Sequence, residues 1–295
     1  MSRRHDVDSP KPGGAPVWPD GAKCAVALTI DVDGEAAIIN MGAGGSPKML
    51  SMGRYGPLRG VPRLLDVLDR QGVCATFFFP GYTLEHWPDV AREVVARGHE
   101  VALHGYLHES FGSLTADEQR RIHERSIQIA EEVLGYRPVG VRPPGDYNDD
   151  TLSIVREMGY IYDSNMRGDD RPYRVSIDGE PSELIEIPLH WELDDTPYFF
   201  FGHGTGYAGV RIESPEAAYE AYTTEFDGYL REGLCYVHTC HPEMMGKPGR
   251  AIVYERLIEY MRRAGDVWFA KCEDIARWWA AATREEGAAA GGDAK

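Results

Sequence analysis

The sequence predicts an α/β fold in which parallel strands and helices alternate around one barrel-like core. Strand-like apolar segments alternate with helical segments of about 10–15 residues, a pattern typical of parallel βαβ units. The alternation continues along most of the 295 residues. Roughly seven such units in one chain favour a barrel over two separate domains. Hydrophobic residues make up 43% of the chain, which is enough for a sizeable core.

Each predicted element rests on a local pattern. Residues 24–31 (CAVALTID) form a compact apolar strand, and residues 61–71 have helical spacing followed by Gly72 as a C-cap. A Thr-x-x-Glu capping box at residues 115–118 opens a helix that extends to residue 134. We expect further strands at residues 73–79, 99–104, 139–141, 160–163, 184–189, 233–238 and 267–270. We expect further helices at residues 88–97, 149–158, 215–231, 250–264 and 273–281.

Composition also predicts where the fold is interrupted. Residues 1–20 are rich in Pro, Gly and charge, and we expect a flexible N-terminal arm. Residues 284–295 are rich in Ala and Gly and predict a disordered tail, which leaves residues 21–283 as a single domain. The Gly-rich residues 40–60 contain no phosphate-binding P-loop pattern, so we expect a long loop there.

Charge and cysteine content exclude several functional classes. The net charge of −16 argues against nucleic acid or an anionic membrane as the main partner, because both attract basic patches. There is no run of about 18 apolar residues that predicts a transmembrane helix, and no apolar segment that predicts a secretory signal. The five cysteines are scattered and include no C-x-x-C pair, which is typical of a reducing compartment. We therefore expect a cytoplasmic protein.

Two histidines four residues apart follow the strand predicted at residues 99–104. They are His104 and His108 in the sequence HGYLH. If the chain turns there into a loop and helix, both side chains lie on one face, about 5–6 Å apart between Cβ atoms. Two imidazoles at that distance can bind one metal ion. The structural alternative is one surface histidine and one core histidine.

Two carboxylates end the first predicted strand. Asp31 and Asp33 stand two residues apart in TIDVDG, so they share one face of the strand. Carboxylates so placed repel each other unless a cation or a proton lies between them. A solvated turn at Asp33 and Gly34 is the structural alternative. With His104 and His108, however, Asp33 completes a set of three ligands with one open position, the pattern of a catalytic metal site.

Four more polar segments follow predicted strands. The segment RPPGD (residues 142–146) can be a rigid turn, Asp163 and Ser164 a helix cap, and HWELDD (residues 190–195) an acidic loop. In HTCHPE (residues 238–243) we assign His238 to the strand, while His241 lies beyond it before a proline. Taken in order, the segments TIDVDG, HGYLH, RPPG, DSN and CHPE resemble the polysaccharide deacetylase family, the NodB-homology carbohydrate esterases. The resemblance extends from about residue 24 to residue 280.

The departures from the commonest family pattern point to one branch of it. Val32 separates the two aspartates, and Gly145 replaces the usual aromatic residue after the double proline. With the Trp-x-Leu-Asp-Asp and His-Pro segments, these features resemble the intracellular branch of peptidoglycan-deacetylase-like proteins, cyclic imidases and cofactor-independent allantoinases. The resemblance implies a distorted (β/α)7 barrel, a homo-oligomer that is a tetramer, and in several members a small C–N substrate.

The resemblance also implies roles for individual residues. Asp33, His104 and His108 match the metal ligands. Asp31 matches the general base and Arg142 the residue that orients it, although the altered segment after Arg142 weakens that match. His241 matches the late histidine that acts as general acid, and Asp163 supports His241 or a loop. We expect Trp191, Gly145 and Asp163 to contact the substrate.

These roles imply a metal-dependent hydrolase of non-peptide C–N bonds that uses a metal-activated water. The expected substrate is an N-acetylated sugar or a small linear or cyclic amide. The alternatives are a polymer N-deacetylase acting on peptidoglycan or chitin, and a barrel that binds a metal or a sugar without turnover. Zn²⁺ is the expected metal, with Co, Ni or Mn as alternatives. We expect residues 198–201 (YFFF) to cover the active-site mouth or to contact a neighbouring subunit, with ordinary core packing as the alternative.

Overall fold

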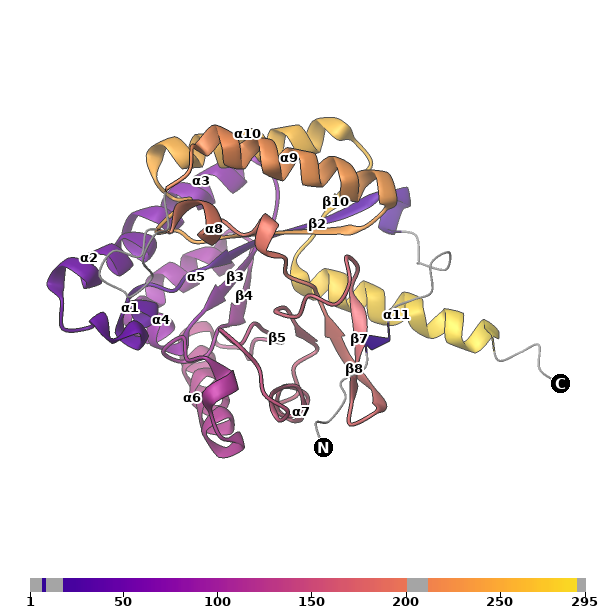
Figure 1. Ribbon diagram of the computed structural model, residues 1–295, viewed down its shortest axis with the longest axis horizontal. Helices are drawn as coiled ribbons and strands as arrows, with labels where there is room; N and C mark the ends of the chain where they lie inside the picture. The colour runs from indigo at the N-terminus through magenta and orange to yellow at the C-terminus, as the bar shows by residue number, and fades with distance from the viewer. Residues whose placement is uncertain (1–6, 9–17, 201–211, 291–295) are drawn as a thin grey trace.

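A curled mixed β-sheet forms the centre of the molecule (Figure 1). The computed structural model describes residues 7–8, 18–200 and 212–290. The strand order is β1-β7-β8-β6-β5-β4-β3-β2-β10, and β9 also pairs with β2. The strands are β1 Val7–Asp8, β2 Cys24–Asp31, β3 Thr76–Phe79, β4 Glu100–Leu103, β5 Gly140–Val141, β6 Tyr162–Asp163, β7 Tyr173–Ile177, β8 Glu180–Glu186, β9 Cys235–Cys240 and β10 Val267–Phe269. Strands β2 to β6 pair in parallel with their neighbours in this order. β8 also pairs in parallel with β6, and β9 and β10 pair in parallel with β2. This arrangement confirms the predicted α/β class and the distorted barrel.

Helices cover both faces of this sheet. In Figure 1, α3, α9 and α10 lie on one side of β2, and α11 runs on the other side. The helices are α1 Glu35–Ile38, α2 Pro47–Tyr55, α3 Val61–Gln71, α4 Gly81–His86, α5 Pro88–Ala96, α6 Ala116–Leu134, α7 Thr151–Glu157, α8 Thr196–Phe199, α9 Pro215–Glu232, α10 Pro248–Ala264 and α11 Cys272–Ala290. No helix among these residues combines the length and the apolar character needed to cross a membrane.

Strand β2 explains why polar side chains collect at one end of the sheet. Its even-numbered residues, such as Val26 and Leu28, join the core formed with α3, α9 and α10. Ala25 and Ala27 face the other way and join the core that contains α11. Alternation along the strand puts Asp31 in the row of these alanines, at the carboxyl end. The carboxyl ends of parallel strands are where barrels of this kind hold their active sites.

Most predicted elements are present with shifted ends. The capping box of α6 is confirmed: Oγ1 of Thr115 accepts from the backbone N–H of Glu118, whose carboxylate accepts from the Thr115 N–H. The antiparallel hairpin of β7 and β8 was not predicted. It turns at Asp178 and Gly179, which both have positive φ, and Asp-Gly is a strong signal for a two-residue hairpin turn.

The long loop predicted at residues 40–60 is wrong. These residues contain α2 and two π-type turns, at residues 39–43 and 56–60. Three glycines there allow the helical backbone to lie directly against other segments. A Cβ at Gly53 would lie 2.4 Å from the carbonyl oxygen of Gly34, and a Cβ at Gly60 would lie 2.3 Å from that of Pro242. The glycines mark close packing here, not chain flexibility.

Gly60→Ala is therefore expected to lower the free energy of unfolding by about 1–3 kcal/mol, because the new methyl group meets rigid backbone. Gly228→Ala is the matched control, since Gly228 lies inside helix α9 and a Cβ there meets nothing within 4 Å. That change should stabilise the protein by about 0.5–1 kcal/mol. Chemical denaturation of both variants checks the pair. Equal effects would show that residue 60 is not closely packed.

Parts of both predicted chain ends belong to the sheet, to the core or to a helix. Trp18, in the predicted arm, is buried and packs against Trp268, Trp278 and Trp279. Residues 7–8 pair with β7 as strand β1, and α11 extends to residue 290, inside the predicted tail. The other residues of the arm, 1–6 and 9–17, and residues 291–295 of the tail lie outside the described residues.

The aromatic segment at residues 198–201 packs largely within its own subunit. Phe199 is buried in the main core beneath the guanidinium of Arg250, and Tyr198 packs edge-on against Tyr222. Phe201 lies outside the described residues. The core alternative therefore holds for Phe199, because its side chain is buried in the core of the same chain and lies against Arg250 of α10.

Candidate active site

Three predicted metal ligands converge at the carboxyl ends of β2 and β4. Oδ1 of Asp33 lies 3.6 Å from Nε2 of His104, and Oδ2 lies 3.6 Å from Nε2 of His108. The two imidazole rings are 4.9 Å apart between centroids and nearly perpendicular. Candidate ligand atoms of the three residues all lie within 4.8 Å of one another. A carboxylate thus stands between two imidazoles, with each oxygen facing one ring nitrogen.

A loop, not a helix, brings the two histidines together. Residues 104–110 contain no helix, so the expected i, i+4 helical face is wrong. The chain reverses because Gly105 and His108 both have positive φ, 68° and 61°. The carboxylate of Glu109 accepts from the backbone N–H of Tyr106 at 3.0 Å and closes the turn. Close approach of the rings depends on this turn, which spacing alone does not specify.

The residues present fit a divalent metal ion. Nδ1 of His104 donates to the carbonyl oxygen of Arg142, which leaves the lone pair of Nε2 facing Asp33. Burial and the nearby His108 lower the pKa of His104 to about 3, so its imidazole is neutral, as a ligand must be. Oδ1 of Asp33 is buried without a hydrogen-bond partner. Tetrahedral bonds of about 2.0–2.2 Å hold ligand atoms roughly 3.3–3.6 Å apart, close to the spacing observed.

Arg142 holds Asp31 beside this cluster. Nη1 of Arg142 donates to Oδ1 of Asp31 at 2.6 Å, and both side chains are almost fully buried. The guanidinium also donates to Thr29 and to the carbonyl and hydroxyl oxygens of Ser164, and it stacks on the Phe78 ring. Five directed contacts fix Arg142, so the altered residues after it do not displace it. Oδ2 of Asp31 remains 3.8 Å from Nε2 of His104.

His241 lies on another side of the cluster, paired with Asp195. Nδ1 of His241 donates to Oδ1 of Asp195 at 2.8 Å, and the His241 backbone N–H donates to Oδ2 at 3.0 Å. Nε2 of the same ring lies 3.9 Å from Oδ2 of Asp33. Burial lowers the pKa of His241, but the hydrogen bond and charge of Asp195, with Asp194 and Asp33, outweigh it and raise the pKa well above its usual value. These contacts favour the protonated form of the His241 imidazole, whose Nε2 faces Asp33.

Asp195 was not predicted as a site residue. It ends the segment WELDD, which the sequence marks only as an acidic loop after a strand. Its partner His241 lies 46 residues further along the chain, so the pairing depends on the fold. The neighbouring bridge between Asp194 and Thr239 fixes the register of this segment against β9. His238 belongs to β9, as predicted, and its side chain is fully buried.

The side chain of Asp163 lies beneath the protein surface, and its predicted contact with the substrate stays a prediction. Its side chain is fully buried, and both carboxylate oxygens accept from the hydroxyl of Tyr147, at 2.7 and 3.0 Å. Burial raises the pKa of Asp163 to about 6, and the adjacent Glu186 carboxyl is also buried. Asp163 therefore supports the loop after the RPPG segment, one of its two predicted roles. His241 takes its support from Asp195 instead.

Glu243 is a second residue that the sequence analysis missed. Its Oε1 accepts from the backbone N–H of Gly34, next to Asp33, at 3.1 Å. Burial and then the charge of Asp33 raise the pKa of Glu243 to about 8. The side chain is half-buried. The position two residues after His241 was the only sequence signal for it.

The two other predicted substrate contacts differ in character. Trp191 is 57% exposed, and the guanidinium of Arg167 lies 4.4 Å from its ring centroid, so the outer ring face is free for contact. Gly145 is exposed and has φ of 70°. A Cβ at this position would lie 2.6 Å from the hydroxyl of Ser110. The glycine is thus required by the turn, and its contact with substrate stays a prediction.

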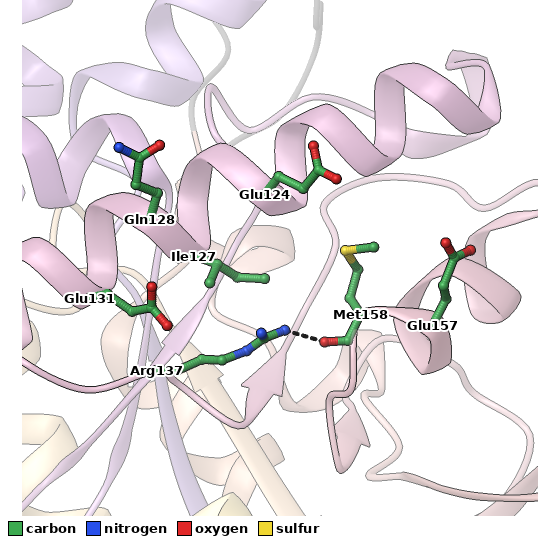
Figure 2. A pocket seen from close by; sticks show the side chains of 7 residues that line it. All are labelled: Glu124, Ile127, Gln128, Glu131, Arg137, Glu157 and Met158. Carbon is green, nitrogen blue, oxygen red and sulfur yellow. Dashed lines mark hydrogen bonds between the residues drawn. The ribbon is translucent and has the colours of Figure 1, made fainter.

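A hollow of about 300 Å³ lies elsewhere, between α6 and the end of α7 (Figure 2). Figure 2 shows Glu124, Ile127 and Glu131 on α6, facing Arg137 and Met158. Arg137 donates to the carbonyl oxygen of Met158 and so spans the hollow. None of the predicted catalytic or metal-binding residues lines it. The chemistry therefore belongs at the strand ends, not in this hollow.

Comparison with known proteins finds relatives that match this chain over most of its length. The model of the polysaccharide deacetylase family matches residues 55–162. A peptidoglycan deacetylase of Helicobacter pylori is 27% identical over 277 residues, 85% of this chain and 94% of that protein. The crystal structure of a candidate polysaccharide deacetylase from Mycobacterium smegmatis is 39% identical, with a TM-score of 0.85, over 91% of this chain and 94% of that one. The structure of Puue allantoinase is 26% identical, with a TM-score of 0.79, over 93% and 95% of the two chains.

The fold, the order of the motifs and the similar proteins all indicate the same family. The relative at 39% identity matches 91% of this chain. This chain belongs to the polysaccharide deacetylase family, and it is a hydrolase of carbon–nitrogen bonds other than peptide bonds.

Proposed function

We propose that this chain hydrolyses a small linear or cyclic amide, or an N-acetylated sugar, with the help of a divalent metal ion, Zn²⁺ before Co, Ni or Mn. One observation carries the proposal. On one side of the Asp33, His104 and His108 cluster lies the carboxylate of Asp31, which Arg142 holds. On another side lies the imidazolium of His241, which Asp195 holds. A base and an acid on different sides of one electrophile site suit the hydrolysis of an amide.

The chain's own residues divide the proton transfers. Arg142 occupies one oxygen of Asp31 and leaves Oδ2 to take a proton from the attacking water. His241 gives a proton from Nε2 to the departing nitrogen, which is necessary because an amide anion is a poor leaving group. Asp33, His104 and His108 would hold the metal, which when bound lowers the pKa of water and polarises the carbonyl. No serine or cysteine nucleophile is needed.

The surroundings of the cluster support a small planar substrate. The Glu243 carboxyl group accepts from the backbone N–H of Gly34, next to Asp33, and its raised pKa of about 8 lets it keep a proton to donate near neutral pH. Trp191 offers an exposed ring. Hydantoins, imides and ureides present carbonyl oxygens on small flat groups, which suit a hydrogen-bond donor and an aromatic face. The allantoinase similarity also supports this class. The peptidoglycan deacetylase similarity supports the alternative, a polymer N-deacetylase.

A substrate screen tests the proposal. The purified protein is stripped with a chelator, reloaded with Zn²⁺ and incubated with N-acetylglucosamine oligomers, hydantoin, succinimide and allantoin. Ring opening or acetate release that needs the metal supports the proposal, and its substrate names the class. Release of acetate from oligomers alone favours the polymer deacetylase. Turnover that is unaffected by the chelator, or no turnover at all, overturns the metal-dependent hydrolase proposed here.

Asp195→Asn is expected to move the alkaline limb of the pH–kcat profile to lower pH by about 1–3 units. Asp195 stabilises the charged form of His241, so its loss lowers the pKa of the acid. A general acid works only below its pKa, and activity is then lost earlier as the pH rises. Glu192→Gln, on an exposed residue of the same segment, is the control and should leave the limb in place. An unmoved limb in Asp195→Asn would show that Asp195 does not tune the acid.

Location and assembly are separate proposals. All five cysteines are free, which supports a reducing cytoplasm. A homotetramer would follow the intracellular branch that the motifs resemble. Light scattering at micromolar concentration tests the assembly, and a monomeric mass would reject it.

A further inference from the structure

The backbone at His108 is held in an uncommon conformation. Its φ of 61° lies in the left-handed region, which residues other than glycine rarely adopt. Such a strained backbone conformation persists only where surrounding contacts stabilise it. At His108 the conformation turns the ring toward Asp33, with Nε2 3.6 Å from Oδ2 of Asp33.

The two histidines of the cluster are held in different ways. The ring of His104 is fixed through its Nδ1, which donates to the Arg142 carbonyl, and its side chain is buried. Among the described residues, none forms a hydrogen bond with a ring nitrogen of His108, and its side chain is 24% exposed. Metal-ligating histidines are normally oriented by such a hydrogen bond. The placement of the His108 ring therefore depends on its backbone.

One side chain holds that backbone. Nδ2 of Asn40 donates to the carbonyl oxygen of His108 at 2.7 Å, although the two residues are 68 positions apart. Asn40 lies in the turn at residues 39–43, which continues directly from α1. Helix α1 begins two residues after Asp33, and the Ala36 N–H donates to the Asp33 carbonyl. A single short segment thus carries one ligand and the clamp on another.

We propose that Asn40 is a positioning residue for the metal. It holds the His108 turn against the Asp33 segment, so that Nε2 of His108 and the Asp33 carboxylate are spaced for one ion before the ion arrives. This inference rests on the metal site of the proposed function. It assigns a role to residues 39–43, a segment that lies outside the motifs shared with the family.

Zinc affinity tests this role without any substrate. Stripped protein competes with a fluorescent chelator for Zn²⁺, and the dissociation constant is measured for the unsubstituted protein, Asn40→Ala and Asn40→Asp. We expect Zn²⁺ to bind Asn40→Ala about five- to tenfold more weakly, because this variant lacks the hydrogen bond to the His108 carbonyl oxygen. Asn40→Asp should bind Zn²⁺ more weakly as well, because a carboxylate has no N–H for the His108 carbonyl. In both variants the visible absorption of bound Co²⁺ should change, since ligand geometry changes.

Ser51→Ala is the matched control. Ser51 lies on the following helix, α2, is exposed, and donates to the backbone carbonyl of Lys48 at 2.7 Å. Its zinc affinity should equal that of the unsubstituted protein. Asn40 is itself exposed, so its variants should fold, and thermal unfolding without metal verifies this.

The outcomes separate this inference from the proposed function. Equal zinc affinity in Asn40→Ala and the unsubstituted protein overturns the role of Asn40 and leaves the metal site intact. An unchanged Co²⁺ absorption spectrum in Asn40→Ala also overturns it, because the ligand geometry would then not depend on Asn40. Failure of the unsubstituted protein to bind Zn²⁺ or Co²⁺ overturns the metal-dependent function, and the role of Asn40 with it.

Discussion

His104→Ala is expected to bind zinc more than about 100-fold more weakly than the unsubstituted protein and to lose nearly all activity. Changes to groups that merely support a ligand already cost about 10–100-fold in affinity, and His104 is itself a candidate ligand with its Nε2 facing Asp33. His108→Ala should behave in the same way. Elemental analysis after dialysis measures the metal content of both variants.

The exposed His86 supplies the control for this experiment. His86→Ala removes an imidazole that stacks on Tyr82 and makes no contact with the cluster, so metal content should be unchanged. Melting of the stripped proteins separates loss of a ligand from loss of fold, since His104 is buried. Full occupancy in both His104→Ala and His108→Ala would refute the site.

The parts of the fold that were predicted depend on neighbouring residues. The strand at β2 is visible in an apolar run, and the start of α6 in a capping box whose two hydrogen bonds are made within four residues. The β7–β8 hairpin was missed although its Asp178–Gly179 turn is also a local signal. Its strands carry charged residues such as Arg174 and Glu183, which obscured their alternation.

Features that depend on distant contacts could not be predicted in this way. The glycines at residues 53, 56 and 60 suggest a loop when taken alone. Only their contacts with Gly34, Glu243 and Pro242 show that they permit close helical packing. For the same reason the motifs placed Asp31, Asp33, His104, Arg142 and His241 at strand ends, but not their supports. Asp195 and Asn40 act through partners 46 and 68 residues away.

Experiments on Asp31, at the end of β2, and on Asp33, in the turn after it, should distinguish the general base from the metal ligand. Asp31→Asn is expected to keep near-native metal content and to lose about 10²–10⁴ in kcat, which is roughly 3–5 kcal/mol of transition-state stabilisation. Arg142 binds one oxygen of Asp31 and leaves the other for proton transfer. Asp31→Asn therefore removes the general base but leaves the metal ligands in place. Asp33→Asn should lose metal as well, because Asp33 alone stands between both histidines.

Parallel measurement of metal content and kcat decides between the assignments. Thermal unfolding is the control for Asp31→Asn, since the buried Arg142 then faces an amide instead of a carboxylate. Arg142 keeps its bonds to Thr29 and Ser164, which should preserve the local structure. If Asp31→Asn sheds the metal and Asp33→Asn retains it, the two roles are reversed. If both variants keep the metal and turn over normally, neither carboxylate takes part, and the deacetylase-like mechanism falls with them.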